Sequence, residues 1–187
     1  GEMQRLIPTK VDGWIKIKEV ETETETETET EPVTETEPET AGPTTEPFVE
    51  EEVQIDAQWI IATTEVDAGA TVALPITVKG DKDGLNSYIA KLAVDDGPTA
   101  TAAEAGDAYA ALQFVDNVPA LIFGATYTDG LNVVAADDST VFYVTFQVPA
   151  DAAPGTLYNV TWKDLIINNG EMQRLIPTKV DGWIKIK

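Results

Sequence analysis

Short runs of alternating apolar and polar residues make up most of the chain after residue 52. Gly, Asp, Asn and Pro separate the runs, whose β-branched and aromatic residues favour strands. Eight runs are of this kind: Val53–Ile61, Thr71–Val78, Tyr88–Val94, Leu112–Val115, Ala120–Tyr127, Val141–Val148, Leu157–Trp162 and Trp183–Lys187. Helical periodicity is scarce, so the pattern predicts an all-β sandwich of eight or nine strands. In the alanine-rich stretch 99–111 we expect a short helical turn or an irregular crossover.

Alternation also predicts which side of each strand is buried, because successive side chains of a strand point to opposite faces. In the run 88–94, Lys91 marks the outer side. In the run 141–148, the set with two phenylalanines is more apolar than its complement and is therefore expected in the core. The residues predicted to point inward on four strands are Tyr88, Ala90, Leu92 and Val94; Leu112 and Phe114; Leu121, Phe123 and Ala125; and Phe142, Val144, Phe146 and Val148.

Three of these strands leave an outward face that is small or apolar. Ile89, Ala93, Val115 and Ile122 all lie on the side predicted to face outward. A solvated sheet face normally carries more Lys, Glu and Thr, so this composition indicates a protein partner. The alternative is a chance scatter of apolar residues on an ordinary exposed face.

The composition excludes several classes of chemistry. The chain has 33 acidic and 12 basic residues and neither histidine nor cysteine. It therefore cannot form a Ser-His-Asp or Cys-His catalytic arrangement, a disulfide, or a zinc site built from Cys and His. The acidic balance argues against nucleic acid, which requires a basic face. The sequence has no apolar run of the roughly 20 residues that a membrane span needs.

Residues 1–18 recur letter for letter as residues 170–187. We interpret residues 1–18 as the C-terminal fragment of a preceding repeat module, with a deliberate duplication as the alternative. The first copy carries the same last strand as the second. It could therefore pair with a sheet edge of a neighbouring molecule or displace its last strand.

Residues 19–52 differ in composition from the rest of the chain. They contain 14 glutamates, 10 threonines and no lysine or arginine, which places two-thirds of the net charge of −21 in this segment. Glutamates at every second position would repel one another on one face of a strand, and four prolines interrupt any ladder. We therefore expect an acidic, extended linker with a maximum reach of about 110–120 Å.

Residues 53–187 resemble a cohesin, the receptor module of cellulosomal scaffoldins. The resemblance rests on the order and spacing of several landmarks: DAGATVALPITVKG (67–80), NSYIAKLAVDDG (86–97), AAEAGDAY (102–109), FVDN (114–117), LIFGATYTDG (121–130), STVFYVTFQVPADAAPGTLYNVTW (139–162) and VDGWIKIK (180–187). Tandem cohesins joined by acidic Thr/Pro linkers also match the repeat and the linker. One departure is Val94-Asp95, where the family usually has Tyr-Asp.

The resemblance implies a nine-stranded jelly-roll β-sandwich that binds a dockerin, a small calcium-loaded helical module. The calcium belongs to the dockerin, so we expect neither a cofactor nor a metal on this chain. The dockerin would lie across the family's eighth, third, sixth and fifth strands, in an extracellular scaffold for plant polysaccharide degradation that also holds neighbouring cohesin modules. By position, that face maps onto Ser87, Ile89, Lys91, Ala93, Gln113, Val115, Ile122 and Gly124, and the loop before the last strand adds Met172 and Leu175.

Other residue patterns suggest different functions. The loop 80–84 has two carboxylates at calcium-loop spacing, although a plain turn also explains them. The pairs Asp95-Asp96 and Asp137-Asp138 could serve glycoside hydrolysis, although aspartate is common in turns. Trp59, Trp162 and Trp183 could form the sugar platform of a carbohydrate-binding module, but packing in the core explains Trp59 and Trp162 better. A structural adhesin repeat would have the same fold and linker.

Overall fold

The computed structural model describes residues 51–127 and 129–187, together with the backbone of residues 10–11 and 14–15. The chain divides into two units, residues 1–46 and 47–187. In the first unit, the two-residue strands β1 (Lys10–Val11) and β2 (Trp14–Ile15) pair in antiparallel fashion. The rest of residues 1–50, including most of the predicted linker and of the first repeat copy, lies outside the described residues.

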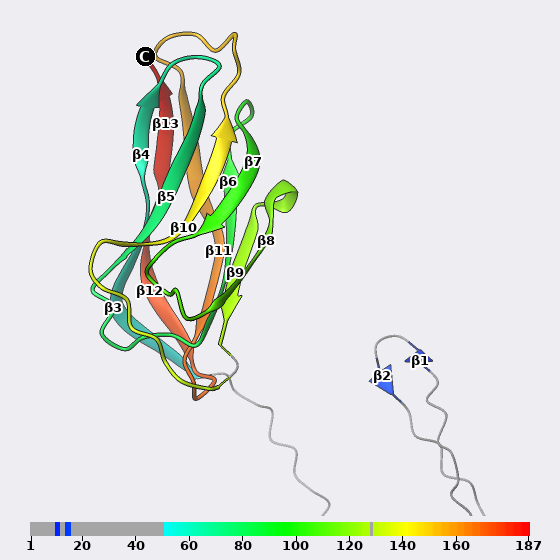
Figure 1. Cartoon of the computed structure of the whole chain (residues 1–187), viewed down its shortest axis with the longest axis vertical. Coiled ribbons are helices and arrows are strands. Elements are labelled where there is room, and N and C mark those ends of the chain that lie inside the picture. Colours follow the sequence, from blue (N-terminus) through cyan, green and yellow to red (C-terminus); the bar gives the residue numbers. More distant parts are fainter. Residues whose placement is uncertain (1–9, 12–13, 16–50, 128) are drawn as a thin grey trace, which may run out of the picture. The chain divides into compact units, whose positions relative to one another are not determined.

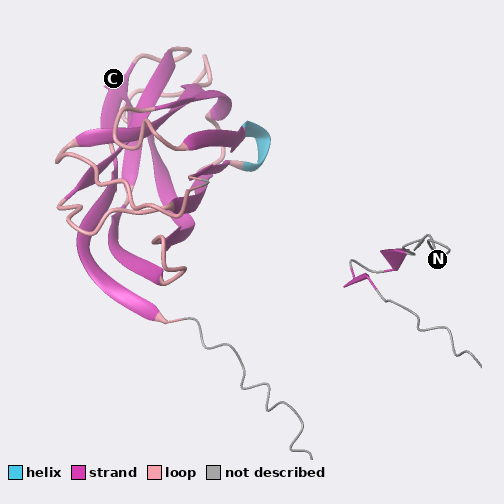
Figure 2. Cartoon of the chain, turned by 60° about the horizontal axis from the view of Figure 1, so that its bottom comes forward, coloured by secondary structure: helices cyan, strands magenta, loops and turns pink. Residues whose placement is uncertain are grey.

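Apart from one short helix, the regular secondary structure described in the second unit consists of strands (Figure 1). Its elements are β3 (Glu52–Ile61), β4 (Thr63–Val66), β5 (Thr71–Lys79), β6 (Ser87–Val94), β7 (Thr99–Ala105), β8 (Gln113–Asn117), the short 3₁₀ helix η1 (Val118–Ala120), β9 (Ile122–Thr126), β10 (Ser139–Gln147), β11 (Leu157–Asn168), β12 (Arg174–Val180) and β13 (Gly182–Ile186). Figure 2 shows η1 as a single helical turn at one edge of the strands. No helix among the described residues is long and apolar enough to cross a membrane.

The eleven strands of residues 51–187 form two packed layers that are joined at one side. One layer has the order β7-β10-β5-β3, and the other has the order β8-β9-β6-β11, with β13 and β4 continuing beside β11. β12 connects the layers because it pairs in parallel with β3 and in antiparallel with the end of β11. If β3 with β4 and β12 with β13 are each counted as one interrupted strand, the sandwich has nine strands, and the predicted jelly-roll class is confirmed.

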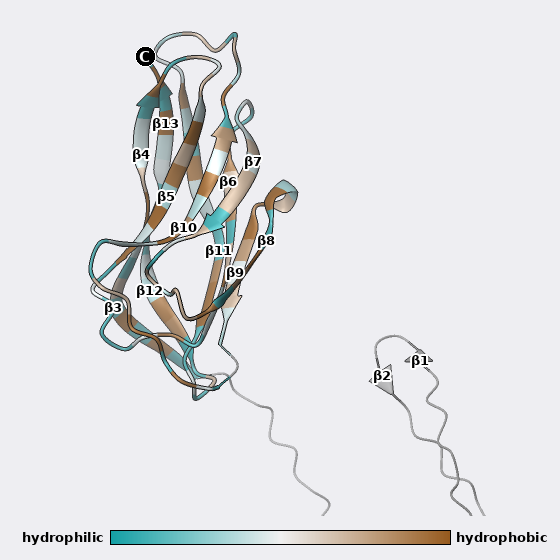
Figure 3. Ribbon diagram, viewed as in Figure 1, coloured by the Kyte–Doolittle hydropathy of each residue, from teal (hydrophilic) through white to brown (hydrophobic). Residues whose placement is uncertain are grey.

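The core lies between the layers and is filled by the predicted inward sets. Along the strands in Figure 3, hydrophobic residues alternate with polar ones, as one buried side per strand requires. Aromatic rings link the layers: the Phe123 and Phe142 ring centroids lie 4.9 Å apart, and those of Trp59 and Tyr88 lie 5.1 Å apart. The predicted inward positions of Tyr88, Phe142 and Phe146 are confirmed, since each of these residues is at most 3% exposed.

The structure corrects the prediction for the first half of the alanine-rich stretch, whereas residues 107–111 form the expected irregular turns. Thr99–Ala105 is the strand β7, which pairs with β10 through a bulge between Thr145 and Phe146. Ala100 and Ala103 pack against the core, so their small side chains fit a strand that lies close to its neighbour. Alanine's helix propensity is a weak preference that such pairing overrides.

Candidate protein-binding face

The outer side of the β8-β9-β6-β11 sheet brings most of the predicted site residues together. We call this side the Ile89 face and define it by the outward residues of the four strands. Cross-strand pairing arranges these residues in three rows. The central row is Val115, Gly124, Ile89 and Ile166; the polar row is Gln113, Thr126, Ser87 and Asn168; and the mixed row is Asn117, Ile122, Lys91 and Asp164.

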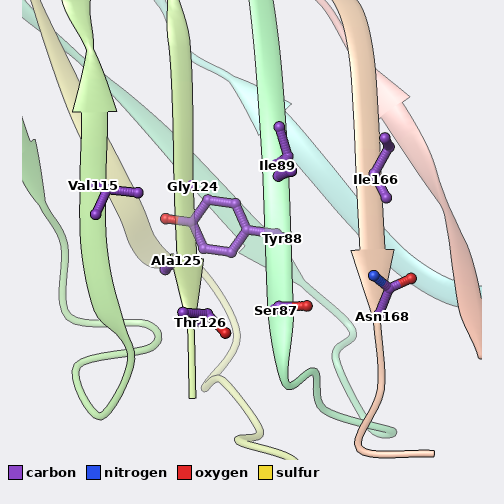
Figure 4. Close-up of a pocket in the computed structure, with 9 residues that line it drawn as sticks. All are labelled: Ser87, Tyr88, Ile89, Val115, Gly124, Ala125, Thr126, Ile166 and Asn168. Atoms are coloured by element: carbon purple, nitrogen blue, oxygen red, sulfur yellow. The ribbon is translucent and has the colours of Figure 1, made fainter. Parts of the chain in front are cut away.

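The central row exposes apolar side chains on an otherwise polar sheet. Ile89 is 53% exposed and Val115 is 58% exposed. Figure 4 shows these two side chains on either side of Gly124, with Ile166 beyond Ile89 on β11. Large apolar side chains of a strand are normally covered by the core, so two of them in line on the outside indicate a surface for another folded body.

Shallow depressions lie along β9 between the side chains of β8 and β6. One is lined by residues of the central and polar rows, and the other by residues of the central and mixed rows. Ile89, Val115 and Gly124 line both. A glycine at the centre of a strand often marks the close approach of a ligand or another chain.

The structure places the individual predicted residues as follows. Ile89, Val115 and Gln113 are exposed, and Ser87, Lys91, Ala93 and Ile122 are half-buried on the same face. Gly124 has little exposed surface, although it lines both depressions. Met172 is 69% exposed in the turn between β11 and β12.

Leu175 was wrongly predicted to contribute to the face. It lies in β12 rather than in a loop, it is 3% exposed, and it belongs to the core. In β12 its side chain points between the layers, where a partner cannot reach it. The prediction failed because residues 174–180 were interpreted as a loop.

Sequence reasoning missed Ile166 and Asn168, which complete two of the rows. The run 157–162 was expected to end at Trp162, but β11 continues to Asn168 through a bulge between Trp162 and Asp164. The available signal was the alternation of Leu165 and Ile167 with Ile166 and Asn168, which resumes after the interruption.

The acidic loop considered for calcium is held by hydrogen bonds within the protein. Asp81 is 8% exposed, and its carboxylate accepts hydrogen bonds from the backbone N–H of Gly84 (2.9 Å), the hydroxyl of Tyr109 (3.0 Å) and the backbone N–H of Ala135 (2.9 Å). Burial, followed by the Asp81 carboxylate, raises the pKa of Tyr109, so the hydroxyl stays protonated and donates. Among the described residues, no group of three His, Cys, Asp or Glu side chains is arranged to hold a metal ion.

The aspartate pairs considered for catalysis also make structural contacts. Asp95 Oδ2 accepts hydrogen bonds from the backbone and side-chain nitrogens of Asn159, and Asp137 Oδ1 accepts one from the backbone N–H of Gly80. These contacts hold β6 to β11 and fix the turn after β5. They give both aspartates the turn role that their sequence context indicated.

Two of the three candidate tryptophans pack in the core or against it rather than in an exposed platform. Trp59 is 1% exposed and lies against Tyr109 and Tyr88 in the core. Trp162 packs against the core, and its indole N–H donates to the carbonyl oxygen of Val180. The predicted core role of these two residues is therefore confirmed.

The fold and the face together define a β-sandwich with one flat side that is apolar at its centre. The family model described as "Cohesin domain" matches residues 57–186, and the chain therefore belongs to the cohesin family. This is a family of non-catalytic interaction modules. A search of curated proteins found no match.

Solved structures of cohesins share the fold. The third ScaB cohesin of R. flavefaciens, in complex with a group 1 dockerin, is 21% identical with a TM-score of 0.62 over 71% of this chain and 96% of that one. The sixth cohesin of scaffoldin B from Acetivibrio cellulolyticus, in complex with a mutant Cel5 dockerin, is 15% identical with a TM-score of 0.61 over 71% and 99%. A non-cellulosomal cohesin from the archaeon Archaeoglobus fulgidus is 16% identical with a TM-score of 0.58 over 71% and 91%.

Proposed function

We propose that this chain is a non-catalytic adaptor whose sandwich binds dockerin modules through the Ile89 face. The observation that carries the proposal is the exposed central row, in which Ile89 and Val115 stand on either side of Gly124. Solved relatives that are complexed with dockerins support this choice of partner. The proposed contact residues are the predicted set without Leu175, extended by Ile166, Asn168, Thr126 and Asn117.

The apolar central row supplies most of the affinity. The polar and mixed rows fix how the partner is aligned on the sheet. Full burial of an exposed Val or Ile side chain contributes about 1.5–3 kcal/mol, so the centre of the face is a suitable hot spot. Lys91 and the amide and hydroxyl groups of the polar row would reject partners that leave them unpaired. A flat sheet with small side chains lets a helix approach closely.

The wider role we propose is that of a scaffold module outside the cell. The acidic segment 19–52 would separate this module from a neighbouring cohesin in the same chain, and the calcium of the complex would belong to the dockerin. Assembly of plant-polysaccharide-degrading enzymes is the proposed purpose. Because one relative is described as non-cellulosomal, that purpose needs a test separate from dockerin binding.

The test is a binding measurement by calorimetry against a panel of calcium-loaded dockerins from enzymes and scaffoldins. We expect at least one to bind, and we expect Ile89→Asp or Val115→Arg to weaken that dockerin's binding by about 100-fold or more, because each buries a charge at the centre of the contact. Ala73→Asp is the matched control, since Ala73 is exposed on β5 in the opposite layer. Unchanged affinity of both face variants would contradict the proposal, and binding to cellulose or xylan without any dockerin would favour a carbohydrate-binding module.

A further inference from the structure

Gly124 is a glycine whose backbone conformation does not require glycine. It lies in the middle of β9 and is absent from the residues with positive φ, so its backbone conformation suits any L-amino acid. A glycine inside a strand costs about 0.5–1 kcal/mol relative to alanine. The backbone therefore does not explain the glycine, and the space above it has to be considered.

A side chain at position 124 would fill the floor between the two exposed apolar residues. An added Cβ would lie 3.8 Å from Ile89 Cγ1, 3.8 Å from Val115 Cγ2 and 3.0 Å from the carbonyl oxygen of Tyr88. The first two distances are ordinary van der Waals contacts, and the third requires a small adjustment. The two depressions share Gly124, Val115 and Ile89 in their linings, so we treat them as one groove along β9 with Val115 and Ile89 as its walls.

The width of the groove limits what can enter it. β8 and β6 are separated by two strand spacings, about 10 Å between backbones. The wall side chains take up part of this distance, so the groove admits one side chain of a partner but not a helix backbone, whose diameter with side chains is about 10–12 Å. The walls are apolar, so the side chain that fits is apolar as well.

Lys91 lies one row away from Gly124 on the Ile89 face and restricts which partner side chain can dock beside it. It is half-buried in the mixed row beside its cross-strand neighbour Asp164, and the three ion pairs found among the described residues include neither of the two. Docking would remove water from its ammonium group, which is costly unless an opposite charge pairs with it. Rows on one face of a strand are about 6.6–6.8 Å apart, close to the roughly 6 Å rise between residues i and i+4 of a helix.

We propose that the partner of the Ile89 face presents a helix aligned with β9, which places one apolar side chain over Gly124 and an acidic side chain, four residues away, beside Lys91. The inference rests on the proposed dockerin binding and specifies which dockerins are selected. Gly124 is then a specificity residue, because any larger residue there closes the groove.

The experiment uses the full chain and the tightest-binding dockerin of the panel. Gly124→Ala is expected to weaken binding by about tenfold, and Val115→Phe, which fills the groove from an exposed wall without crowding the Tyr88 carbonyl, by at least as much. Ala73→Val adds two carbons to an exposed position of the opposite layer and should leave the dissociation constant unchanged. Thermal unfolding of each variant verifies that the fold is retained.

A double-mutant cycle tests the charge pair. Lys91→Met should weaken binding by about fivefold, and changing the acidic residue of the dockerin helix to its amide should cause no further loss in that background. If the wild type binds and both groove variants bind within about twofold of it, or if no dockerin acid couples to Lys91, the inference is overturned. If the wild type binds no dockerin, the proposed function itself fails, and the two failures are thus distinguished.

Discussion

At the scale of single residues, Asp81 shows how a loop carboxylate can hold distant parts of the sandwich together. Its three hydrogen-bond donors lie 3, 28 and 54 residues further along the chain. It therefore fixes the loop before β6, the segment before β8 and the loop before β10 at one point. Only the nearest donor can be anticipated from local sequence, which is why the turn was predicted but the clamp was not.

Replacing Asp81 should destabilise the sandwich far more than replacing its neighbour Asp83. Asp81→Ala leaves the Tyr109 hydroxyl and two backbone N–H groups without their acceptor, which should lower the free energy of unfolding by about 3 kcal/mol. Tyr109→Phe leaves the Asp81 carboxylate two donors and should cost about 1 kcal/mol. Asp83 is exposed, so Asp83→Ala should change stability by less than about 0.5 kcal/mol. Urea unfolding measures all three, and equal stabilities of the two alanine variants would refute the clamp.

At the scale of elements, regular alternation was predictable and its interruptions were not. The buried side of β6 follows a period of two, so the outward positions of Ile89 and Lys91 could be read from the sequence. In β11 the bulge at Lys163 shifts the period by one residue, so a continuous reading would place Ile166 in the core. Bulges depend on the pairing of neighbouring strands, which a local pattern does not contain.

The bulge makes β11 tolerant of one deletion and intolerant of an insertion nearby. Trp162 pairs with Leu92 and Asp164 with Lys91, so Lys163 is the extra residue. Deleting Lys163 keeps Leu165 and Ile167 facing the core and should cost less than about 2 kcal/mol. An alanine inserted between Asp164 and Leu165 turns both side chains outward and should cost more than about 5 kcal/mol, as two lost core residues do.

Thermal unfolding monitored by tryptophan fluorescence compares these two variants with the wild type. A cooperative transition for the deletion variant and its loss for the insertion variant are expected. Equal damage in both would show that the bulge serves the twist of the sheet rather than its register.

At the scale of the whole molecule, one 18-residue sequence is found in two structural contexts. In the first copy Lys10 pairs with Ile15, whereas their counterparts in the second copy, Lys179 and Ile184, pair with Trp59 of β3 and Tyr158 of β11. Residues with the same sequence therefore pair differently in the two copies, according to the strands that lie beside them. The hypothesis that the first copy displaces the last strand of a neighbouring molecule remains to be tested.

Energetics argue against such displacement while the C-terminal copy is intact. An incoming identical segment gains the contacts that the outgoing one loses, so the net contact energy is close to zero. The exchange between molecules also costs about 4–15 kcal/mol of association entropy at a 1 M standard state. The turn that joins β11 to β12, in which Asn169 Oδ1 accepts hydrogen bonds from the backbone N–H groups of Glu171 and Gln173, keeps the original hairpin in place without that cost.

We therefore expect residues 51–187 to behave as the full chain does. The buried core of the sandwich lies within residues 57–186, so its unfolding temperature should agree with that of the full chain within about 2 °C. Light scattering after size exclusion should give monomer masses for both, from micromolar to millimolar concentration. If the full chain alone forms dimers, and substitution of Ile15 by Asp abolishes them, the first copy does exchange with the C-terminal hairpin, and the energetic argument is wrong.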